Sequence, residues 1–187
     1  MSGGRGRLFV ISGPSGAGKG TVVQELLRRR GELVLSVSAT TRPARAAERN
    51  GVHYDFVSRN DFLSQRDSGG FLEWAEVYGN LYGTPRAPVD AALAAGRDVI
   101  CELDIQGALS VKRIAPEAVL VFIEPPSLDE LFMRLRKRGT EDPAALSKRL
   151  RGAYEEVKQK GLYDHIVVND DLEAAVGALV RILEEHG

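Results

Sequence analysis

A glycine-rich segment near the start of the sequence, LFVISGPSGAGKGT (8–21), has the composition of a loop that binds phosphate. Gly13, Gly18 and Lys19 fit the pattern G-x-x-x-x-G-K, between an apolar run and a segment with helical periodicity. Glycines let several backbone N–H groups approach one phosphate, the start of a helix adds a favourable dipole, and lysine adds a mobile positive charge. This context disfavours a plain glycine-rich turn. It predicts a nucleoside triphosphate site formed by Gly13, Pro14, Ser15, Gly16, Ala17, Gly18, Lys19, Gly20 and Thr21.

Gly20 occupies the position at which many such loops carry the serine or threonine that binds magnesium. The hydroxyl arrives one residue later, at Thr21, and one residue on an α-helix is a rotation of about 100°. We therefore expect Mg²⁺ to be held mainly by nucleotide oxygens and waters, because this ion gives up its waters reluctantly. Glu102, at the end of an apolar run, is the candidate for orienting a magnesium-bound water. The alternative for Glu102 is a strand-end charge without that role.

A second group of residues could bind a phosphate monoester. Arg42 and Arg45 are three residues apart, and Tyr54 follows beyond a glycine turn. Two guanidinium groups and a phenol can surround a phosphate, and arginine does so with fixed bidentate geometry. Taken alone, arginines in a loop are as often solvated surface residues.

The elements that must position these groups alternate along the chain. Short, continuous apolar runs are separated by segments of helical periodicity. Because the runs are unbroken, they predict the strands of a parallel sheet that helices cover on both faces. The predicted strands are Arg7–Ser12 and the runs LVLSVS (33–38), DVICELDI (98–105), AVLVFI (118–123) and HIVVN (165–169).

Helix boundaries are also visible in the sequence. The segment 19–30 places its apolar residues on one face and ends at a glycine. Ser127 and Glu130 form a predicted capping box for a helix that follows them. Asp170 or Asp171 is expected to cap the last helix.

Two segments interrupt the alternation. Residues 38–88 are aromatic and contain the strand-like pieces VHYDFVS (52–58) and FLEWAEVYG (71–79), with a short helix between them. We expect an insert with its own small sheet, and Trp74 in its core. The polar stretch GTEDPAA (139–145) lies between two predicted helices and suggests a mobile flap.

Composition limits the possible functions. The formal net charge of −1 argues against a broad nucleic-acid-binding surface, and no apolar run is long enough to span a membrane. Cys101 is the one cysteine, and within an apolar run it predicts a buried, inert thiol. With no signal-peptide-like segment, the expected location is cytoplasmic, without an obligatory protein partner.

The segment TTRPARAAERNGVHYDFV (40–57) matches the signature of guanylate kinases at every fixed position. FLEWAEVYGNLYGT, ELDIQG, RKRGTED, SKRL and VVND also resemble blocks of that family, in the same order. The resemblance extends from Leu8 to the last helix. It implies an α/β fold in which three layers surround a central parallel sheet, with a mixed α/β insert that binds the nucleoside monophosphate (NMP). In this reading the single domain 1–187 has a core of residues 7–37 and 89–187, an insert 38–88 and a lid at about 138–149.

The resemblance implies phosphorylation of GMP, and of dGMP, by ATP and Mg²⁺. By position, the residues that resemble those binding the GMP phosphate are Ser38, Arg42, Arg45 and Tyr54. Those that resemble the residues recognising guanine are Glu73, Thr84 and Asp104, with Tyr82 lining the same pocket. Asn169 matches a position near the ATP base. Arg134, Arg138 and Arg149 resemble arginines that close over the transferring phosphoryl group, and Lys19 and Arg42 complete the expected catalytic set.

The chemistry of guanine agrees with these assignments. A carboxylate such as Glu73 can accept from N1–H and N2–H₂, while the Thr84 hydroxyl can donate to O6. Transfer between bound nucleotides needs alignment and charge neutralisation more than a base or a nucleophile. We therefore expect no catalytic histidine, and His53, beside the phosphate-binding arginines, is interpreted as a surface or structural residue.

Two alternatives belong to other classes. Inactive guanylate-kinase-like modules bind phosphorylated peptides, but these typically degrade the phosphate loop, which is intact here. A related kinase acting on a ribosyl bisphosphate would keep the loop but would have no use for the guanine-recognising residues.

Overall fold

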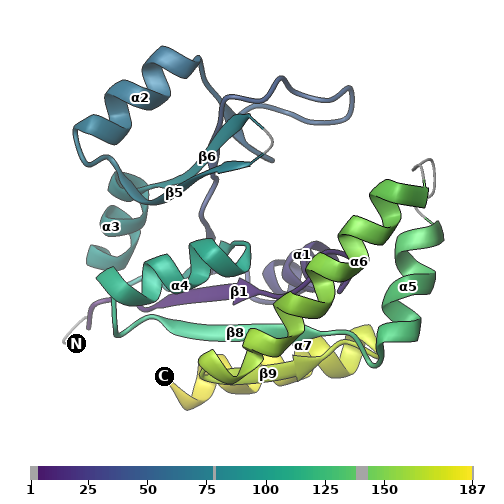
Figure 1. Cartoon of the computed structure of the whole chain (residues 1–187). Helices are drawn as coiled ribbons and strands as arrows, with labels where there is room; N and C mark the ends of the chain where they lie inside the picture. Colours follow the sequence, from purple (N-terminus) through teal and green to yellow (C-terminus); the bar gives the residue numbers. More distant parts are fainter. Residues whose placement is uncertain (1–3, 78, 138–142, 187) are drawn as a thin grey trace. The chain divides into compact units, whose positions relative to one another are not determined.

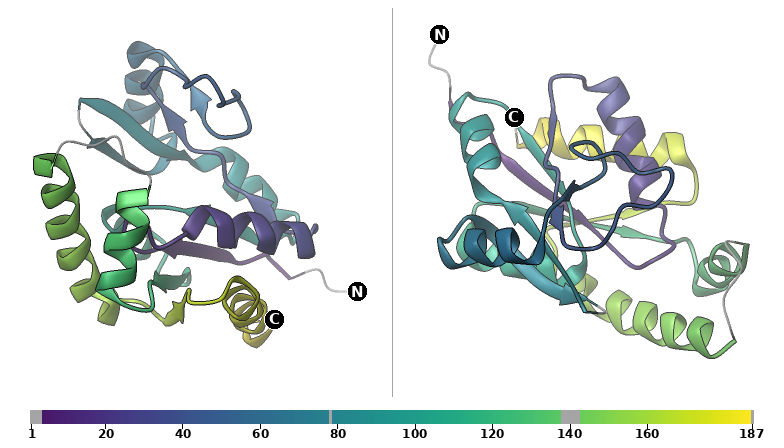
Figure 2. Two further views of the ribbon diagram at one scale, coloured as in Figure 1. Left: turned by 90° about the vertical axis from the view of Figure 1, so that its right-hand side faces the viewer. Right: turned by 90° about the horizontal axis from the view of Figure 1, so that it is seen from above.

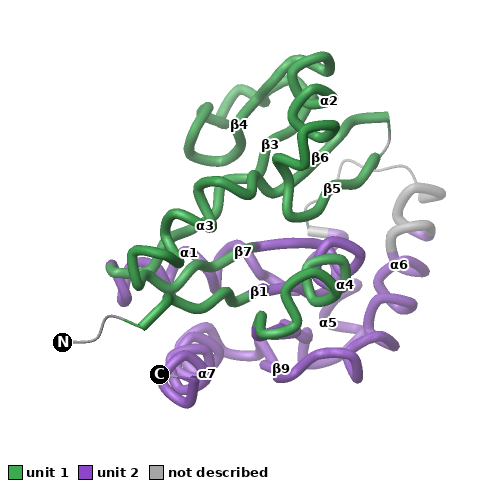
Figure 3. Tube along the Cα trace, turned by 90° about the vertical axis from the view of Figure 1, so that its left-hand side faces the viewer, with its two compact units in different colours: residues 1–9, 32–101, 109–118 green, residues 10–31, 102–108, 119–187 purple. Residues whose placement is uncertain are grey.

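The computed structural model describes residues 4–77, 79–137 and 143–186 (Figure 1). The chain divides into two compact units, which Figure 3 distinguishes by colour. The first contains the residues up to Phe9, Glu32–Cys101 and Leu109–Ala118; the second contains Val10–Gly31, Glu102–Ala108 and the residues from Val119 onward.

A five-stranded sheet has the order β2-β7-β1-β8-β9. Two of its ladders are parallel in register: Val34 pairs with Val99, and Val121 pairs with His165. All residues of β1, and all of β8 except the last, are buried, as expected for parallel strands that are covered on both faces. The predicted parallel sheet is therefore confirmed. Its strands are β1 (Leu8–Ser12), β2 (Val34–Leu35), β7 (Val99–Glu102), β8 (Val119–Glu124) and β9 (His165–Val168).

Two helices of the second unit, α5 and α7, begin at polar caps. Ser127 accepts a hydrogen bond from the Glu130 N–H at 3.1 Å, and Asp171 accepts one from the Ala174 N–H at 2.9 Å, which confirms the Asp171 cap and the Ser127 half of the predicted capping box. The Glu130 carboxylate accepts from Arg134 Nε at 3.1 Å. The first and last helices of the unit pack against each other (Figure 2). These helices are α1 (Lys19–Arg29), α5 (Leu128–Lys137), α6 (Pro143–Lys158), the short 3₁₀ helix η1 (Gln159–Leu162) and α7 (Leu172–Glu185).

The first unit contains a second, mixed sheet with the order β4-β3-β6-β5. Its core includes Phe62 and Phe71, whose stacked rings have centroids 4.3 Å apart, together with Ala39 and Leu81. The small sheet expected within residues 38–88 is therefore present. The elements are β3 (Ala39–Thr40), β4 (Asp55–Phe56), α2 (Arg59–Asp67), β5 (Phe71–Val77), β6 (Asn80–Pro85) and α3 (Arg86–Ala94); α4 (Ile105–Ile114) has residues in both units.

Trp74 is not in the core, contrary to the prediction. Its side chain is 46% exposed, and the Arg66 guanidinium lies 5.1 Å from its ring centroid. Strand alternation does place Trp74 on the opposite face from Glu73, but that face of β5 is solvated. Phe62 and Phe71 fill the interior instead.

LVLSVS also forms less strand than its apolar pattern predicts. The parallel sheet takes only Val34–Leu35, although the Ser36 N–H still donates to Ile100 O. The chain then enters the second sheet at Ala39, directly after this run.

Truncating the insert core should destabilise the protein much more than truncating the exposed tryptophan. We expect Phe62→Ala to lower the free energy of unfolding by about 3–5 kcal/mol, the usual cost of such a cavity. Trp74→Ala, the control, should cost about 1 kcal/mol or less, mainly a lost cation–π contact. Urea denaturation followed by circular dichroism compares them, and equal losses would contradict this description of the core.

Candidate functional site

The predicted phosphate loop connects β1 to α1 within the second unit. Gly13 and Gly18 have φ of 140° and 85°, which side-chain-bearing residues rarely adopt. A Cβ on Gly13 would lie 2.2 Å from Ile123 O, and one on Gly18 would lie 2.5 Å from Asn169 Nδ2. Both the backbone conformation and the packing therefore require glycine at these two positions.

Asn169 connects this loop to the end of β9. Its Nδ2 donates to Ala17 O at 2.7 Å, and its own backbone O accepts from both terminal nitrogens of Arg134 at 3.2 Å. A cavity of about 440 Å³ opens here, within the range of small-molecule sites. It is lined by Gly16, Gly18, Thr21, Arg134, Asn169, Asp170 and Leu172.

Lys19 has carboxylates as well as the loop around it. Its Nζ donates to Gly13 O at 2.6 Å and to Pro14 O at 3.3 Å. Desolvation raises the pKa of Glu102, although part of that side chain reaches solvent, and the nearby Lys19 charge opposes the rise. Desolvation likewise raises the pKa of Glu156 on α6, and the Lys19 charge again opposes the rise.

Glu156 was missed by the sequence analysis. Its carboxylate lies near Lys19 and accepts a hydrogen bond from the Ser15 backbone N–H, which belongs to the phosphate loop. In the sequence it stands in the charged run YEEVKQK, which looks like an ordinary solvated helix face. Only the packing of α6 gives it this position.

The candidate magnesium residue lies beside Gly20. A Cβ on Gly20 would lie 3.7 Å from both carboxylate oxygens of Glu102, an ordinary van der Waals distance. No three histidine, cysteine, aspartate or glutamate side chains converge as a metal site among residues 4–77, 79–137 and 143–186. A single carboxylate fits Mg²⁺, which commonly binds one or two carboxylates plus nucleotide phosphates and waters.

Arg42, in the first unit, is held by Glu48. The two terminal nitrogens of Arg42 donate to the two carboxylate oxygens of Glu48, each at 2.9 Å, and the Arg45 N–H donates to Glu48 at 2.8 Å. These bonds lower the pKa of Glu48 to about 2. The Arg42 guanidinium carbon lies 5.6 Å from the centroid of the Tyr54 ring, and the Tyr82 side chain also hydrogen-bonds to Arg42. The side chains of Arg42 and Tyr54, two of the predicted phosphate-binding residues, are thus together, and Glu48 is an addition to them.

Glu73 and Thr84 face each other across β5 and β6. They are paired in register, and the Thr84 hydroxyl donates to Glu73 Oε1 at 2.7 Å. Thr84 is fully buried and Glu73 is half-buried. In this structure the hydroxyl predicted to bind guanine O6 therefore orients the carboxylate, and donation to O6 stays a prediction.

The other predicted residues are more dispersed. Ser38 is half-buried and Arg45 is exposed, both in the first unit. Asp104 lies in the second unit, where its Oδ1 caps α4 by accepting from the Gly107 N–H at 2.7 Å. Arg138 lies outside the described residues; Arg149 is within α6, but its side chain also lies outside them.

Two residues predicted to be non-catalytic have ordinary structural environments. Cys101 is buried, and desolvation raises the pKa of its thiol to about 12, which confirms an inert thiol. His53 is exposed, and its Nδ1 accepts from the Arg49 N–H at 3.1 Å.

In the described part of the chain, no helix is both long and apolar enough to cross a membrane.

Comparison with known proteins identifies one family throughout. The family model for guanylate kinase matches residues 5–186. A guanylate kinase of Carboxydothermus hydrogenoformans is 52% identical over 96% of this chain and 88% of its own, and one of Thermus thermophilus is 53% identical over 98% and 82%. The crystal structure of guanylate kinase from Anaplasma phagocytophilum superposes with a TM-score of 0.80 at 35% identity, covering 97% of this chain and 86% of that one.

Neutralising Glu156 should change how stability depends on pH. Desolvation raises the pKa of Glu156 in the folded protein, so protonation of this carboxyl stabilises the fold. This stabilisation is fully present below the unfolded-state pKa of about 4.3 and is lost as pH rises through the folded-state pKa. We expect Glu156→Gln to match the original protein near pH 4 and to become relatively more stable towards pH 7. The measurement is the urea midpoint at each pH. The neighbouring exposed carboxyl supplies a control, Glu155→Gln, and the same trend in both variants would refute the assignment.

Proposed function

This chain belongs to the guanylate kinase family, and we infer from that membership that it is an enzyme that phosphorylates GMP. Its family name and the phosphate loop support ATP as the phosphoryl donor, with Mg²⁺ as the accompanying ion. We also propose dGMP as an acceptor, since the residues proposed for this site recognise the phosphate and the guanine base. The buried thiol of Cys101 agrees with a cytoplasmic location.

The donor nucleotide binds to the second unit in this proposal. The backbone N–H groups from Gly13 to Thr21 and the Lys19 ammonium bind its phosphates, at the positive end of α1. The cavity beside Asn169 takes the base, and Arg134 in its wall adds a positive charge. Lys19 reaches the phosphates by leaving its present acceptors, Gly13 O and Pro14 O.

The acceptor nucleotide binds to residues of the first unit. Arg42, Arg45, Tyr54 and Ser38 bind the phosphate of GMP. Glu48 positions the Arg42 guanidinium, because a bidentate ion pair fixes both its location and its plane.

Glu73 determines the choice of base. Its carboxylate accepts from N1–H and N2–H₂ of guanine, and Tyr82 lines the same pocket; Asp104, in the second unit, stays a predicted guanine-binding residue. The observation that carries this assignment is the 2.7 Å hydrogen bond from buried Thr84, which orients the half-buried Glu73 carboxylate on β5. Adenine presents an acceptor at N1, so the same carboxylate would be left partly unpaired beside it.

The transfer itself needs no covalent intermediate. The attacking group is a phosphate oxygen of GMP, which is anionic near neutral pH, and catalysis consists of alignment and charge neutralisation. Lys19, Arg42 and Arg134 supply positive charge, with Arg138 and Arg149 as predicted additions. Mg²⁺, when bound, neutralises the donor phosphates, and Glu102 would hold one of its waters.

A change at Glu73 should impair guanine use without affecting the donor. We expect Glu73→Gln to lower kcat/KM for GMP about 10- to 100-fold, because a buried donor left unpaired costs about 1–3 kcal/mol. A coupled assay with GMP, dGMP, IMP and AMP measures this, and calorimetry measures ATP binding. Glu76→Gln, on the same strand but exposed, is the control. Weakened ATP binding in Glu73→Gln would show a damaged fold instead of a damaged pocket.

The glycine at position 20 should not limit magnesium use. A serine there would meet Glu102 at an ordinary contact distance, so we expect Gly20→Ser to be nearly neutral. Glu102→Gln should require more Mg²⁺ for half-maximal kcat and for Mg²⁺-dependent ATP binding. Titrations of both variants with magnesium test the two expectations. A large gain by the serine variant at low magnesium would show that the missing hydroxyl is a deficit.

A further inference from the structure

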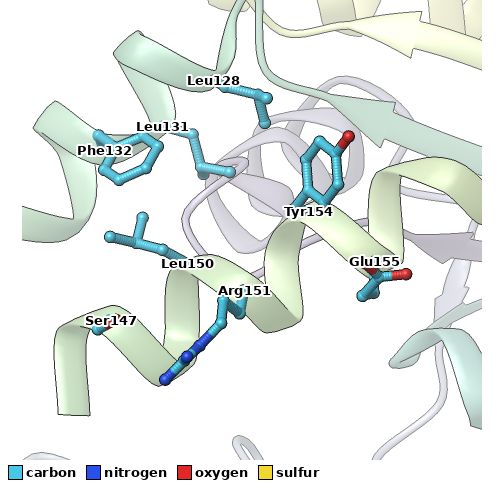
Figure 4. Close-up of a pocket in the computed structure, with 8 residues that line it drawn as sticks. All are labelled: Leu128, Leu131, Phe132, Ser147, Leu150, Arg151, Tyr154 and Glu155. Carbon is cyan, nitrogen blue, oxygen red and sulfur yellow. The ribbon is translucent and has the colours of Figure 1, made fainter. Parts of the chain in front are cut away.

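A second cavity lies within the second unit, between α5 and α6 (Figure 4). Its volume is about 520 Å³, and its lining shares no residue with the phosphate-loop cavity. In Figure 4, apolar side chains of α5 point toward α6, and Leu150 and Tyr154 point back from α6. The lining residues are Leu128, Leu131, Phe132, Ser147, Leu150, Arg151, Tyr154 and Glu155.

Large apolar side chains are left partly in water at this cavity. Leu128, Phe132 and Tyr154 are 38%, 40% and 49% exposed, above a small buried cluster that includes Leu131. Their exposure is unfavourable by about 25 cal/mol for each Å² of apolar surface, and a ligand that covers them recovers this free energy. The volume is within the range of about 300–1,000 Å³ that small-molecule sites occupy.

The charges at the rim indicate the sign of the ligand. Lys158 pairs with Glu155 at 2.9 Å, and its Nζ also lies 4.4 Å from the Tyr154 ring centroid. The Glu155 carboxylate is thereby neutralised. Arg151 makes no ion pair or hydrogen bond through its side chain with any residue in the described ranges. The rim therefore carries a net positive charge, which complements a single anionic group.

One lining residue also contacts the phosphate loop. A Cβ on Gly16 would lie 2.9 Å from Leu131 Cδ1 and 3.0 Å from Leu135 Cδ2, so these side chains pack directly against the loop backbone. One turn away on α5, the Arg134 guanidinium donates to Asn169 O, and the Asn169 side chain donates to Ala17 O in the loop. A displacement of α5 would therefore disturb the loop both at Gly16 and, through Asn169, at Ala17.

We propose that the α5–α6 cavity is an effector site for a small aromatic monoanion, which changes nucleotide binding at the phosphate loop through Leu131. The aromatic part covers the exposed apolar side chains, and the anionic group pairs with Arg151. Linkage requires the nucleotide to change the affinity of the effector by the same factor. The nucleotide part of this inference rests on the proposed ATP site, whereas occupation of the cavity does not.

The probe is 8-anilinonaphthalene-1-sulfonate, an aromatic monoanion whose fluorescence rises in apolar sites. We expect saturable binding of one molecule per chain, weakened about tenfold by Arg151→Gln, which removes a charge-assisted contact. Ser147→Phe, which fills the cavity, should abolish binding. Arg136→Gln, an exposed arginine of α5 outside the cavity, should bind the probe normally. Circular dichroism melts establish that each variant is folded.

Calorimetry with ATP, with and without saturating probe, tests the coupling. We expect the ATP Kd to shift by a finite factor that reaches a plateau, equal to the shift of the probe Kd caused by ATP. Competition without a plateau, no shift at all, or equal losses in Arg136→Gln and Arg151→Gln would each overturn the proposal. So would sedimentation showing a dimer that Ser147→Phe dissociates, since a second copy would then cover the cavity. If ATP fails to bind the unaltered protein, the proposed function fails, while probe binding still tests the cavity.

Discussion

The hydrogen bond from the Asn169 side chain to Ala17 O holds the phosphate loop in place. Its donor nitrogen occupies the space that a Cβ on Gly18 would need. The hydrogen bond between the loop and the end of β9 can therefore form only with glycine at position 18. The Asn169 backbone carbonyl meanwhile accepts from Arg134. A single buried residue thus fixes the loop and an arginine of α5, and any loss of that bond would leave buried polar groups unpaired.

Carboxylates accompany the positive groups proposed to bind phosphate. Arg42 is paired with Glu48 in the first unit, and Lys19 has Glu102 and Glu156 nearby in the second. A bidentate partner holds Arg42 ready in one orientation, which lowers the entropy that binding must overcome. Desolvated carboxylates near Lys19 have the opposite character, since their charge competes with an incoming polyphosphate. The two proposed nucleotide sites therefore differ in the surroundings of their positively charged groups.

Helix α5 takes part in two cavities of the second unit. Arg134 lines the cavity beside the loop, and Leu131 lines the cavity beside α6 while packing against Gly16. The helix is amphipathic, and its apolar side is divided between a buried cluster and side chains that remain partly exposed. Such a helix can carry a packing change from one cavity to the other without any change in the sheet.

The sequence by itself determined the phosphate loop, the parallel strands, the helix caps and the family. Their signals are local: glycine and lysine spacing, unbroken apolar runs, and polar residues before helices. Glu48 lies within the segment that matches the family signature, but its bidentate bond to Arg42 is formed only in the folded loop.

Only the tertiary structure decided which side chains from distant segments contact one another. Glu156 looks like part of a solvated helix face, yet it meets Ser15 far earlier in the chain. Trp74 is a large aromatic residue of the kind expected in a core, but Phe62 and Phe71 occupy the interior of the insert and Trp74 is exposed. Thr84 donates to Glu73 because two antiparallel strands place them in register. Spacing along one chain predicts periodic elements, whereas contacts between distant segments depend on the volume and direction of side chains that meet only when the chain is folded.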